Sequence, residues 1–156
     1  MEKSKIDRIL ASQKPNTVKV LTFKKEKKKK VTTYKSGWIT VGGQTIFVRS
    51  SYEKNYTRFL QYRVEKEEIK GWEYEPETFY FEKIKRGCSS YKPDYRITNL
   101  DGSTFWIELK GHLDAKSKTK LKRFAKFFPN EKMVLVEKAE YLQLAAMFHR
   151  IITDWE

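Results

Sequence analysis

The order of secondary-structure signals in the second half of the chain constrains the fold more than any other sequence feature. Residues 91–98 and 104–110 are rich in β-branched and aromatic residues and flank Asn99-Leu100-Asp101-Gly102, which predicts a hairpin. Residues 116–128 then carry apolar side chains at helical spacing, and residues 133–136 form a short all-apolar segment. A strand that is reached through a helix pairs in parallel with its neighbour, so a mixed sheet is expected.

The segments before residue 70 predict a hairpin and a helix. Residues 38–41 and 44–48 are β-prone, and Gly42-Gly43 between them readily adopts the positive φ angles of a tight turn. The helix is expected from residue 51 to about 69, since Tyr52, Tyr56, Phe59 and Leu60 recur at helical spacing after Ser50, a good N-cap.

The remaining segments complete an α/β (α+β) domain. Residues 72–81 are aromatic and extended, with Pro76 favouring an edge or a bend, and residues 139 to about 152 predict a closing helix. The order from residue 51 is therefore helix, three strands, helix, strand, helix. Such an order predicts a small mixed sheet flanked by helices, in a domain that spans residues 37–156.

Residues 1–36 are expected to form a basic N-terminal extension. Residues 3–13 favour a short helix and residues 18–23 a short strand, and the charge run of residues 24–30 follows. This run is either a solvated connector or an arm that contacts DNA through Lys27, Lys28, Lys29 and Lys30.

Positive charge is concentrated in two blocks. The chain has 33 Lys and Arg against 20 Asp and Glu, a formal net charge of +13. Residues 1–35 hold twelve basic and three acidic residues, and residues 115–132 hold seven basic residues and Glu131. Blocks of this kind favour a polyanionic partner, because lysine and arginine release the counterions of nucleic-acid phosphates.

The cysteine and histidine content limits which metal the protein can bind, and the lack of a long apolar run limits where in the cell it can reside. Cys88 is the one cysteine, so an internal disulfide is excluded, and with only His112 and His149 beside it a structural zinc site is not expected. A metal bound here should be a hard cation held by carboxylates. No apolar run is long enough to cross a bilayer, and we expect a cytoplasmic protein with no membrane partner.

Two acidic residues and a lysine coincide with the predicted hairpin of residues 91–110. Pro93-Asp94 begins its first strand, and Glu108-Leu109-Lys110 ends its second. Side chains alternate along a strand, so Glu108 and Lys110 project from one face, and pairing across the turn brings Asp94 close to Glu108. Two carboxylates with waters and a phosphate oxygen suit Mg²⁺, for which Mn²⁺ substitutes, and a neighbouring ammonium can position or activate a water.

This pattern resembles the PD-(D/E)XK, or restriction-endonuclease-like, nuclease superfamily. The surrounding segments are most similar to the phage endonuclease I family of Holliday-junction resolvases, and the likeness covers residues 47–136. The Arg-Ser-x-x-Glu start of the first helix also resembles transposon-end nucleases of the TnsA type. The motifs concerned are Arg49-Ser50-Ser51-Tyr52-Glu53, Trp72-Glu73-Tyr74-Glu75-Pro76, Tyr91-Lys92-Pro93-Asp94-Tyr95 and Ile107-Glu108-Leu109-Lys110-Gly111.

The resemblance implies an Mg²⁺-dependent endodeoxyribonuclease that acts as a homodimer in a bacterial or phage-infected cytoplasm. It assigns the metal to Asp94, Glu108 and the Leu109 carbonyl, with Glu53 assisting directly or through water, and makes Lys110 the catalytic lysine. The longer turn between Asp94 and Glu108 and the longer extension depart from the family and leave the substrate open. Branched DNA, a sequence-specific site, a transposon end, and DNA binding without cleavage all remain alternatives.

The other candidate residues each have a structural alternative. Ser50-x-x-Glu53 is also a helix capping box, so Glu53 has a structural reason to be there. The candidates for contact with DNA are Arg49 at the start of that motif, His112 after the catalytic strand, and Lys116, Lys118 and Lys120 on the following helix. A loop histidine and a solvated helix face are the alternatives for these residues.

Overall fold

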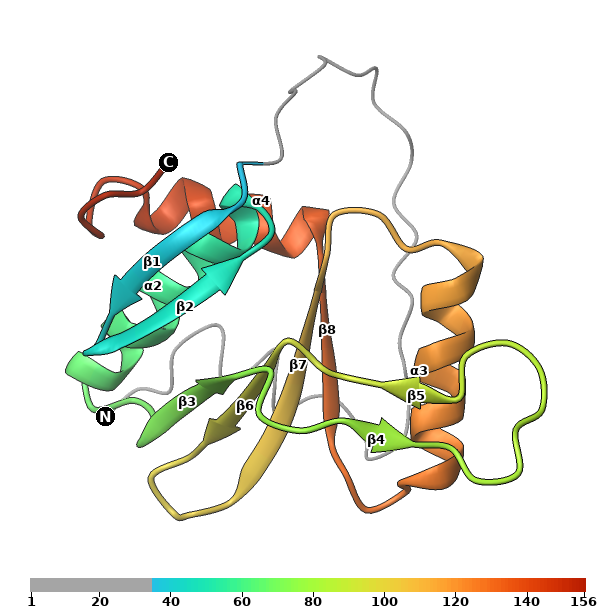
Figure 1. Cartoon of the computed structure of the whole chain (residues 1–156). Helices are drawn as coiled ribbons and strands as arrows, with labels where there is room; N and C mark the ends of the chain where they lie inside the picture. The colour runs from blue at the N-terminus through green and yellow to red at the C-terminus, as the bar shows by residue number, and fades with distance from the viewer. Residues whose placement is uncertain (1–34) are drawn as a thin grey trace.

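A computed structural model describes residues 35–156. The predicted helix of residues 3–13, the strand of residues 18–23 and the charge run of residues 24–30 lie outside these residues. The elements in chain order (Figure 1) are β1 (Gly37–Val41), β2 (Gln44–Val48), α2 (Ser51–Glu65), β3 (Gly71–Tyr74), β4 (Phe79–Tyr80), β5 (Ser90–Tyr91), β6 (Tyr95–Thr98), β7 (Thr104–Lys110), α3 (Ala115–Phe127), β8 (Met133–Glu137) and α4 (Lys138–Phe148).

A four-stranded mixed sheet forms the centre of the domain, with strand order β3-β6-β7-β8. The pairs β3–β6 and β6–β7 are antiparallel, whereas β7 and β8 are parallel and are joined through α3. The expected α+β class, with a small mixed sheet and helices beside it, is therefore confirmed. The hairpin turn of residues 99–102 lies where the sequence predicts it, with Gly102 at a φ of 85°.

Alternating side chains of β7 divide the core between the two faces of the sheet. Phe105, Ile107 and Leu109 pack with residues of α2 and α4, which lie together on one face. Trp106 points the other way and packs with Leu121 and Phe124 of α3 and with the β4–β5 ribbon. Since alternate residues share a face, Glu108 and Lys110 project on the side of Trp106.

The β1–β2 hairpin covers α2. Its strands pair from Gly37↔Val48 to Val41↔Gln44, and the turn places Gly42 and Gly43 at φ angles of 58° and 76°. Side chains of Val41 and Ile46 pack against the main core, so the inner face of the hairpin is apolar, as amphipathic strands require. The predicted hairpin is confirmed.

Two predicted strands are each divided in two. The extended segment of residues 72–81 leaves the main sheet at Glu75, which makes the last hydrogen bond to β6, because Glu75 has a φ of 44° and Pro76 follows it. Residues 91–98 are likewise interrupted at Pro93, which cannot donate a ladder hydrogen bond. The short pieces, β4 and β5, pair with each other in a separate ribbon.

Helices α2 and α4 end earlier than their periodicity predicts. Helix α2 ends at Glu65 instead of residue 69, because Glu67 takes a φ of 54° and turns the chain. Ile69 is nevertheless buried, which explains why its apolar side chain extends the helical pattern. Helix α4 ends at Phe148. None of the helices in residues 35–156 is long and apolar enough to cross a membrane.

Candidate active site

The carboxylates of Asp94 and Glu108 face each other across β6 and β7. Tyr95 pairs with Ile107 in the antiparallel register, and the next position along places Asp94 opposite Glu108. Asp94 is only 7% exposed and Glu108 only 4%. Oδ2 of Asp94 accepts a hydrogen bond from the Leu109 backbone N–H at 2.8 Å, which fixes its side chain against the end of β7. The predicted convergence of these two acids is what the hairpin register produces.

Lys110 and Tyr91 hold the two oxygens of Glu108. Nζ of Lys110 lies 2.6 Å from Oε1, and the Tyr91 hydroxyl donates to Oε2 at 2.8 Å. Lys110 therefore shares a face with Glu108, as alternation along the strand predicts. Tyr91 comes from β5 and is itself buried against α3, so the ribbon helps to orient the acid.

Burial and like charge raise the pKa of Asp94 to about 8. Loss of solvent is the largest cause, followed by the charge of Glu108; the Leu109 N–H and Lys110 act in the opposite direction. Burial alone lowers the pKa of Lys110, but the carboxylates, with Glu108 first, outweigh it and raise that pKa overall. Burial and Glu108 also raise the pKa of Tyr91, so its phenol stays a donor.

Glu53 lies in the first turn of α2, where it takes part in the helix cap and neighbours the site. Its backbone N–H donates to Oγ of Ser50 at 3.2 Å, the expected N-cap bond. Its carboxylate accepts from the Arg49 N–H at 2.9 Å, the Ser50 hydroxyl at 3.1 Å and the Tyr74 hydroxyl at 2.9 Å. Its charge also contributes to the raised pKa of Asp94. The cap interpretation is confirmed, and a role toward the metal stays a prediction.

Glu75 is a third acid beside Asp94 that sequence reasoning missed. Its N–H donates to the Asp94 carbonyl at 2.8 Å, which continues the β3–β6 ladder by one position. Its carboxylate lies 2.7 Å from Nη1 of Arg49 and 3.7 Å from Nζ of Lys92. Arg49 therefore lies beside Glu53 and Glu75, and its contact with DNA stays a prediction. The β3–β6 register places Glu75 next to Asp94, and this register cannot be predicted from the sequence alone.

The remaining DNA-contact candidates lie beyond β7. His112 and the lysines Lys116 and Lys118 are exposed, and within residues 35–156 no hydrogen bond or ion pair joins them or Lys120 to the site carboxylates. The N-terminus of α3 is capped by Asp114, whose carboxylate accepts from the Ser117 N–H at 2.7 Å. That N–H group is therefore occupied by the cap. Lys27 to Lys30 lie outside the described residues.

A basic loop between β4 and β5 adjoins α3 and was not predicted as a functional segment. Lys83, Lys85 and Arg86 are exposed in it. Arg123 of α3 donates to the carbonyl of Cys88 and, at 3.1 Å, to that of Arg86, which ties the loop to the helix. Figure 1 shows this loop beside α3, away from the β1–β2 hairpin. The loop thus enlarges the basic surface that the lysines of α3 begin.

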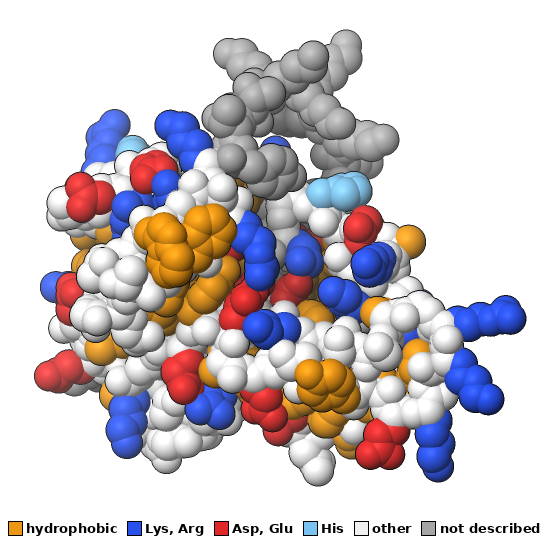
Figure 2. Space-filling view, in the orientation of Figure 1, with side chains coloured by type: hydrophobic (Ala, Val, Ile, Leu, Met, Phe, Trp, Pro, Cys, Tyr) orange, Lys and Arg blue, Asp and Glu red, His pale blue; other side chains and the backbone are white. Residues whose placement is uncertain are grey.

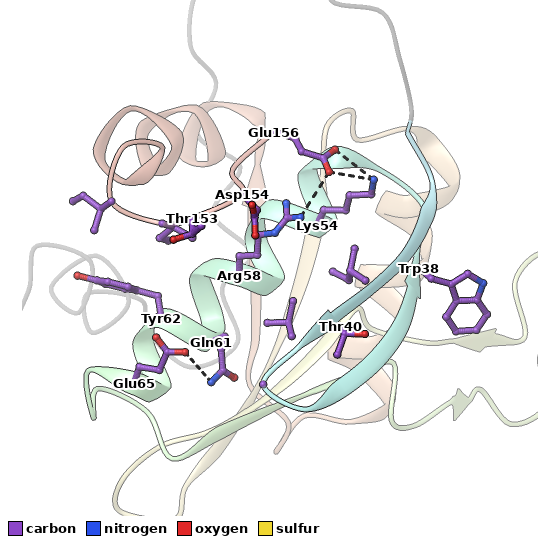
Figure 3. Close-up of a pocket in the computed structure, with 15 residues that line it drawn as sticks. Trp38, Thr40, Lys54, Arg58, Gln61, Tyr62, Glu65, Thr153, Asp154 and Glu156 are labelled. Carbon is purple, nitrogen blue, oxygen red and sulfur yellow. Dashed lines mark hydrogen bonds and ion pairs between the residues drawn. The ribbon is translucent and has the colours of Figure 1, made fainter.

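A separate pocket of about 520 Å³ lies between β1, α2 and the C-terminal residues (Figure 3). Lys54 and Arg58 line it, but the Glu156 carboxylate already lies 3.4 Å and 3.7 Å from their nitrogens. Buried Asn55 also bonds both the N–H and the carbonyl of Glu156, at 2.9 and 2.7 Å. These contacts hold the C-terminal segment on α2, and the pocket contains none of the predicted site residues.

The available acids suit a cation that takes few protein ligands. No group of three or more His, Cys, Asp or Glu side chains in residues 35–156 is arranged to hold a metal. The donors at the site are instead the two carboxylates of Asp94 and Glu108. Mg²⁺ commonly binds through one or two carboxylates and keeps several waters, so this donor set fits Mg²⁺. Comparisons with protein-family models, characterised proteins and solved structures found no match to this chain.

Proposed function

We propose that the protein is a metal-dependent endonuclease that hydrolyses phosphodiester bonds in DNA, and that its sheet is the core of a restriction-endonuclease-like fold. One observation carries the proposal: two buried carboxylates, Asp94 and Glu108, meet across adjacent strands beside the Lys110 ammonium. Two buried acids at one sheet position are costly unless something positive compensates them. The single positive charge of Lys110 does not balance two carboxylates, so a bound cation would compensate the remaining negative charge.

Asp94, Glu108 and the Leu109 carbonyl would hold Mg²⁺. The ion would supply Lewis-acid stabilisation of the phosphate and a more acidic water. The Leu109 N–H fixes one oxygen of Asp94, while Tyr91 fixes one oxygen of Glu108, so the chain orients both acids before substrate binds. Orientation of this kind lowers the reorganisation that accompanies the reaction.

Lys110 is proposed to position the attacking water and to stabilise negative charge on the phosphate. Its raised pKa keeps the ammonium protonated in the free protein, where it pairs with Glu108. A positively charged donor suits charge stabilisation better than it suits a general base. Glu53, which three donors hold near Asp94, would assist through a water molecule.

The DNA backbone is proposed to cross the site between the β1–β2 hairpin and α3. Basic side chains stand on both sides of the acids: Arg49 and Lys92 pair with Glu75 near β3, and the lysines of α3 with the β4–β5 loop lie beyond. Figure 2 shows acidic side chains surrounded by basic ones on this face. Contacts to phosphate position a duplex without reading its sequence.

Branched DNA is the proposed substrate, and a homodimer is the proposed assembly. Cutting two strands normally needs two active sites, which a twofold dimer supplies. No base-reading module is visible in residues 35–156, and this favours recognition of DNA shape over a sequence-specific or transposon-end site.

Incubation of the protein with supercoiled plasmid and with four-way junction DNA tests the proposal directly. We expect nicked, linear or resolved products in Mg²⁺ or Mn²⁺ and none in EDTA. Binding of either DNA without cleavage in any divalent cation would overturn the nuclease proposal in favour of a non-cleaving DNA-binding protein.

Removal of residues 1–30 should weaken DNA binding and flatten its salt dependence. The deletion removes eleven Lys and Arg, each of which can displace counterions from DNA. The described sheet starts after this segment, with β1 at Gly37, so the shortened chain should keep its circular dichroism spectrum. Affinity measured from low to moderate salt provides the slope. An unchanged slope would rule out a DNA-contacting arm and leave the connector alternative.

A four-way junction should be bound and cut in preference to a linear duplex of equal length and sequence. Excess nonspecific duplex absorbs simple charge attraction, whereas recognition of shape survives it. The measurement is cleavage of both labelled substrates in one tube with competitor. Equal loss on the two substrates would contradict the resolvase assignment, and cutting at one fixed duplex sequence would indicate a homing-type or transposon-end nuclease.

A further inference from the structure

The outer face of the β1–β2 hairpin carries a pair of exposed aromatic residues, Trp38 and Phe47. They are direct partners in the strand register, and their ring centroids lie 5.4 Å apart in an edge-to-face arrangement. Trp38 is 71% exposed and Phe47 46% exposed. Large aromatic side chains rarely stay this open without a function, since burial is strongly favourable for them.

The packing of the hairpin on the core does not depend on Trp38 and Phe47. The inner face already packs on the core through Val41 and Ile46. On the outer face, Thr40 and Thr45 share a 3.0 Å hydrogen bond next to the aromatic pair. Trp38 is among the residues that line the pocket between β1 and α2, but in Figure 3 its indole extends outward from β1, away from the side chains of α2. A cross-strand aromatic pair contributes about 0.2–1 kcal/mol to a hairpin, and that contribution does not account for a tryptophan that remains 71% exposed.

Arg49 connects the hairpin that carries the aromatic pair to the candidate active site. Phe47 precedes Arg49 by two residues, a step of about 7 Å along an extended chain. The Arg49 N–H binds Glu53 and its guanidinium pairs with Glu75, whose own N–H binds the Asp94 carbonyl. Figure 2 shows hydrophobic side chains exposed over this hairpin, next to the charged side chains of the site.

We propose that Trp38 and Phe47 form a stacking platform for an unpaired nucleobase of the DNA strand that reaches the site. This inference rests on the proposed nuclease function, which places that strand. Bases inside a duplex have both faces covered, so only an unpaired base can use the platform, and every base offers a π face. The substrate class is therefore DNA with an unpaired base beside a duplex, which a flap, a gap or the opened branch point of a junction supplies.

Charge favours DNA over a second protein chain as the occupant. The chain carries a net charge of +13, and exposed Lys35 precedes β1 while Arg49 follows β2. A dimer contact through this face would bring the Lys35 and Arg49 charges of two copies together, whereas a polyanion is attracted to them, so the proposed homodimer is expected to form through another face. Proteins that bind single-stranded nucleic acids commonly place aromatic rings between basic side chains.

Binding to paired and unpaired DNA in Ca²⁺ tests the platform without cleavage. The two labelled substrates are a duplex with a three-nucleotide gap and the same duplex fully paired. Wild type should prefer the gapped duplex, and Trp38→Leu should bind it about tenfold more weakly with little change on the paired duplex. Trp38→Phe, which keeps an aromatic face, should retain most of the affinity. Leu100→Ser, an exposed apolar residue in the β6–β7 turn, is the control and should match wild type.

Tryptophan emission supplies a second readout. Trp72 and Trp106 are only 4% and 2% exposed, and Trp155 is partly buried, so Trp38 is the tryptophan most open to a base. Gapped DNA should quench the emission of the wild-type protein, and Trp38→Phe should lose most of that quenching. Unchanged emission in wild type would overturn the stacking contact.

Two further results separate this inference from the proposed function. Cleavage of junction DNA in Mg²⁺, with equal affinity of wild type and Trp38→Leu for the gapped duplex, would overturn the platform alone. Gap preference that Trp38→Leu abolishes, without cleavage in any cation, would overturn the nuclease and keep the platform. If Trp38→Leu instead converts a dimer to a monomer in sedimentation, with no change in gap preference, the aromatic pair is a contact between copies.

Discussion

Asp94→Asn and Glu108→Gln should each reduce DNA cleavage in Mg²⁺ by about 1,000-fold or more. Each substitution keeps the shape of the side chain and removes a charged ligand from the proposed ion. A bound metal contributes several kcal/mol to stabilisation of the transition state, and about 4 kcal/mol corresponds to a 1,000-fold change in rate. The measurement is the single-turnover rate on the best DNA substrate.

DNA affinity in Ca²⁺ should stay within about threefold for both variants, because these buried acids are assigned to the ion and not to phosphate. Asp101→Asn is the matched control. Asp101 is a fully exposed acid in the turn of the same hairpin, where its carboxylate binds Ser103 at the end of β6 and β7 away from Asp94. Near wild-type cleavage by either site variant would show that the metal is held elsewhere or is not used.

The hairpin that carries the site could be predicted because its information is local. The turn of residues 99–102 fixes the register of two strands whose periodicity is clear, and that register alone brings Asp94 opposite Glu108. Alternation within β7 likewise places Lys110 on the face of Glu108. The parallel addition of β8 followed from the intervening helix. These features depend on sequence separations of fewer than about thirty residues.

Glu75 and Tyr91 could not be predicted, because their positions depend on contacts between distant segments. Glu75 reaches Asp94 through the β3–β6 register, and the turn after Tyr74 rests on a non-glycine residue with positive φ. Tyr91 looked like part of a long strand. It belongs instead to the β4–β5 ribbon, which packs on α3 and aims the phenol at Glu108. Aromatic packing on α3, and not strand propensity, decides that division.

Glu53 and Arg49 show that a sequence motif does not decide which of two interactions a side chain makes. The sequence assigned Glu53 to a cap or to a metal, and the structure shows the cap bonds together with an influence on Asp94. Arg49 was expected to contact DNA, yet its guanidinium pairs with Glu75 at 2.7 Å. A phosphate at this position would compete with Glu75 for Arg49, so the pairing and the predicted DNA contact are alternative states of one side chain.

The stability of the metal-free protein should fall as pH rises, and Asp94 should account for much of the fall. Its folded-state pKa is raised to about 8, above the value of about 3.9 for an unfolded chain. Between these values the folded state holds a proton that the unfolded state does not. The resulting stabilisation is complete below about pH 4 and is lost as pH rises through about 8.

Asp94→Asn should therefore match wild type in thermal stability near pH 4 and exceed it increasingly from there to pH 9, in EDTA. The amide still accepts the Leu109 N–H but carries no charge beside Glu108. The full linkage gain at pH 9 is on the order of 5 kcal/mol, or about 15 °C in melting temperature. Added Mg²⁺ or Ca²⁺ should stabilise wild type at pH 9 and do little for Asp94→Asn, because the ion compensates the charge that the variant lacks. A stability difference independent of pH, or equal stabilisation of both proteins by the cation, would show that Asp94 is not the buried acid that the metal neutralises.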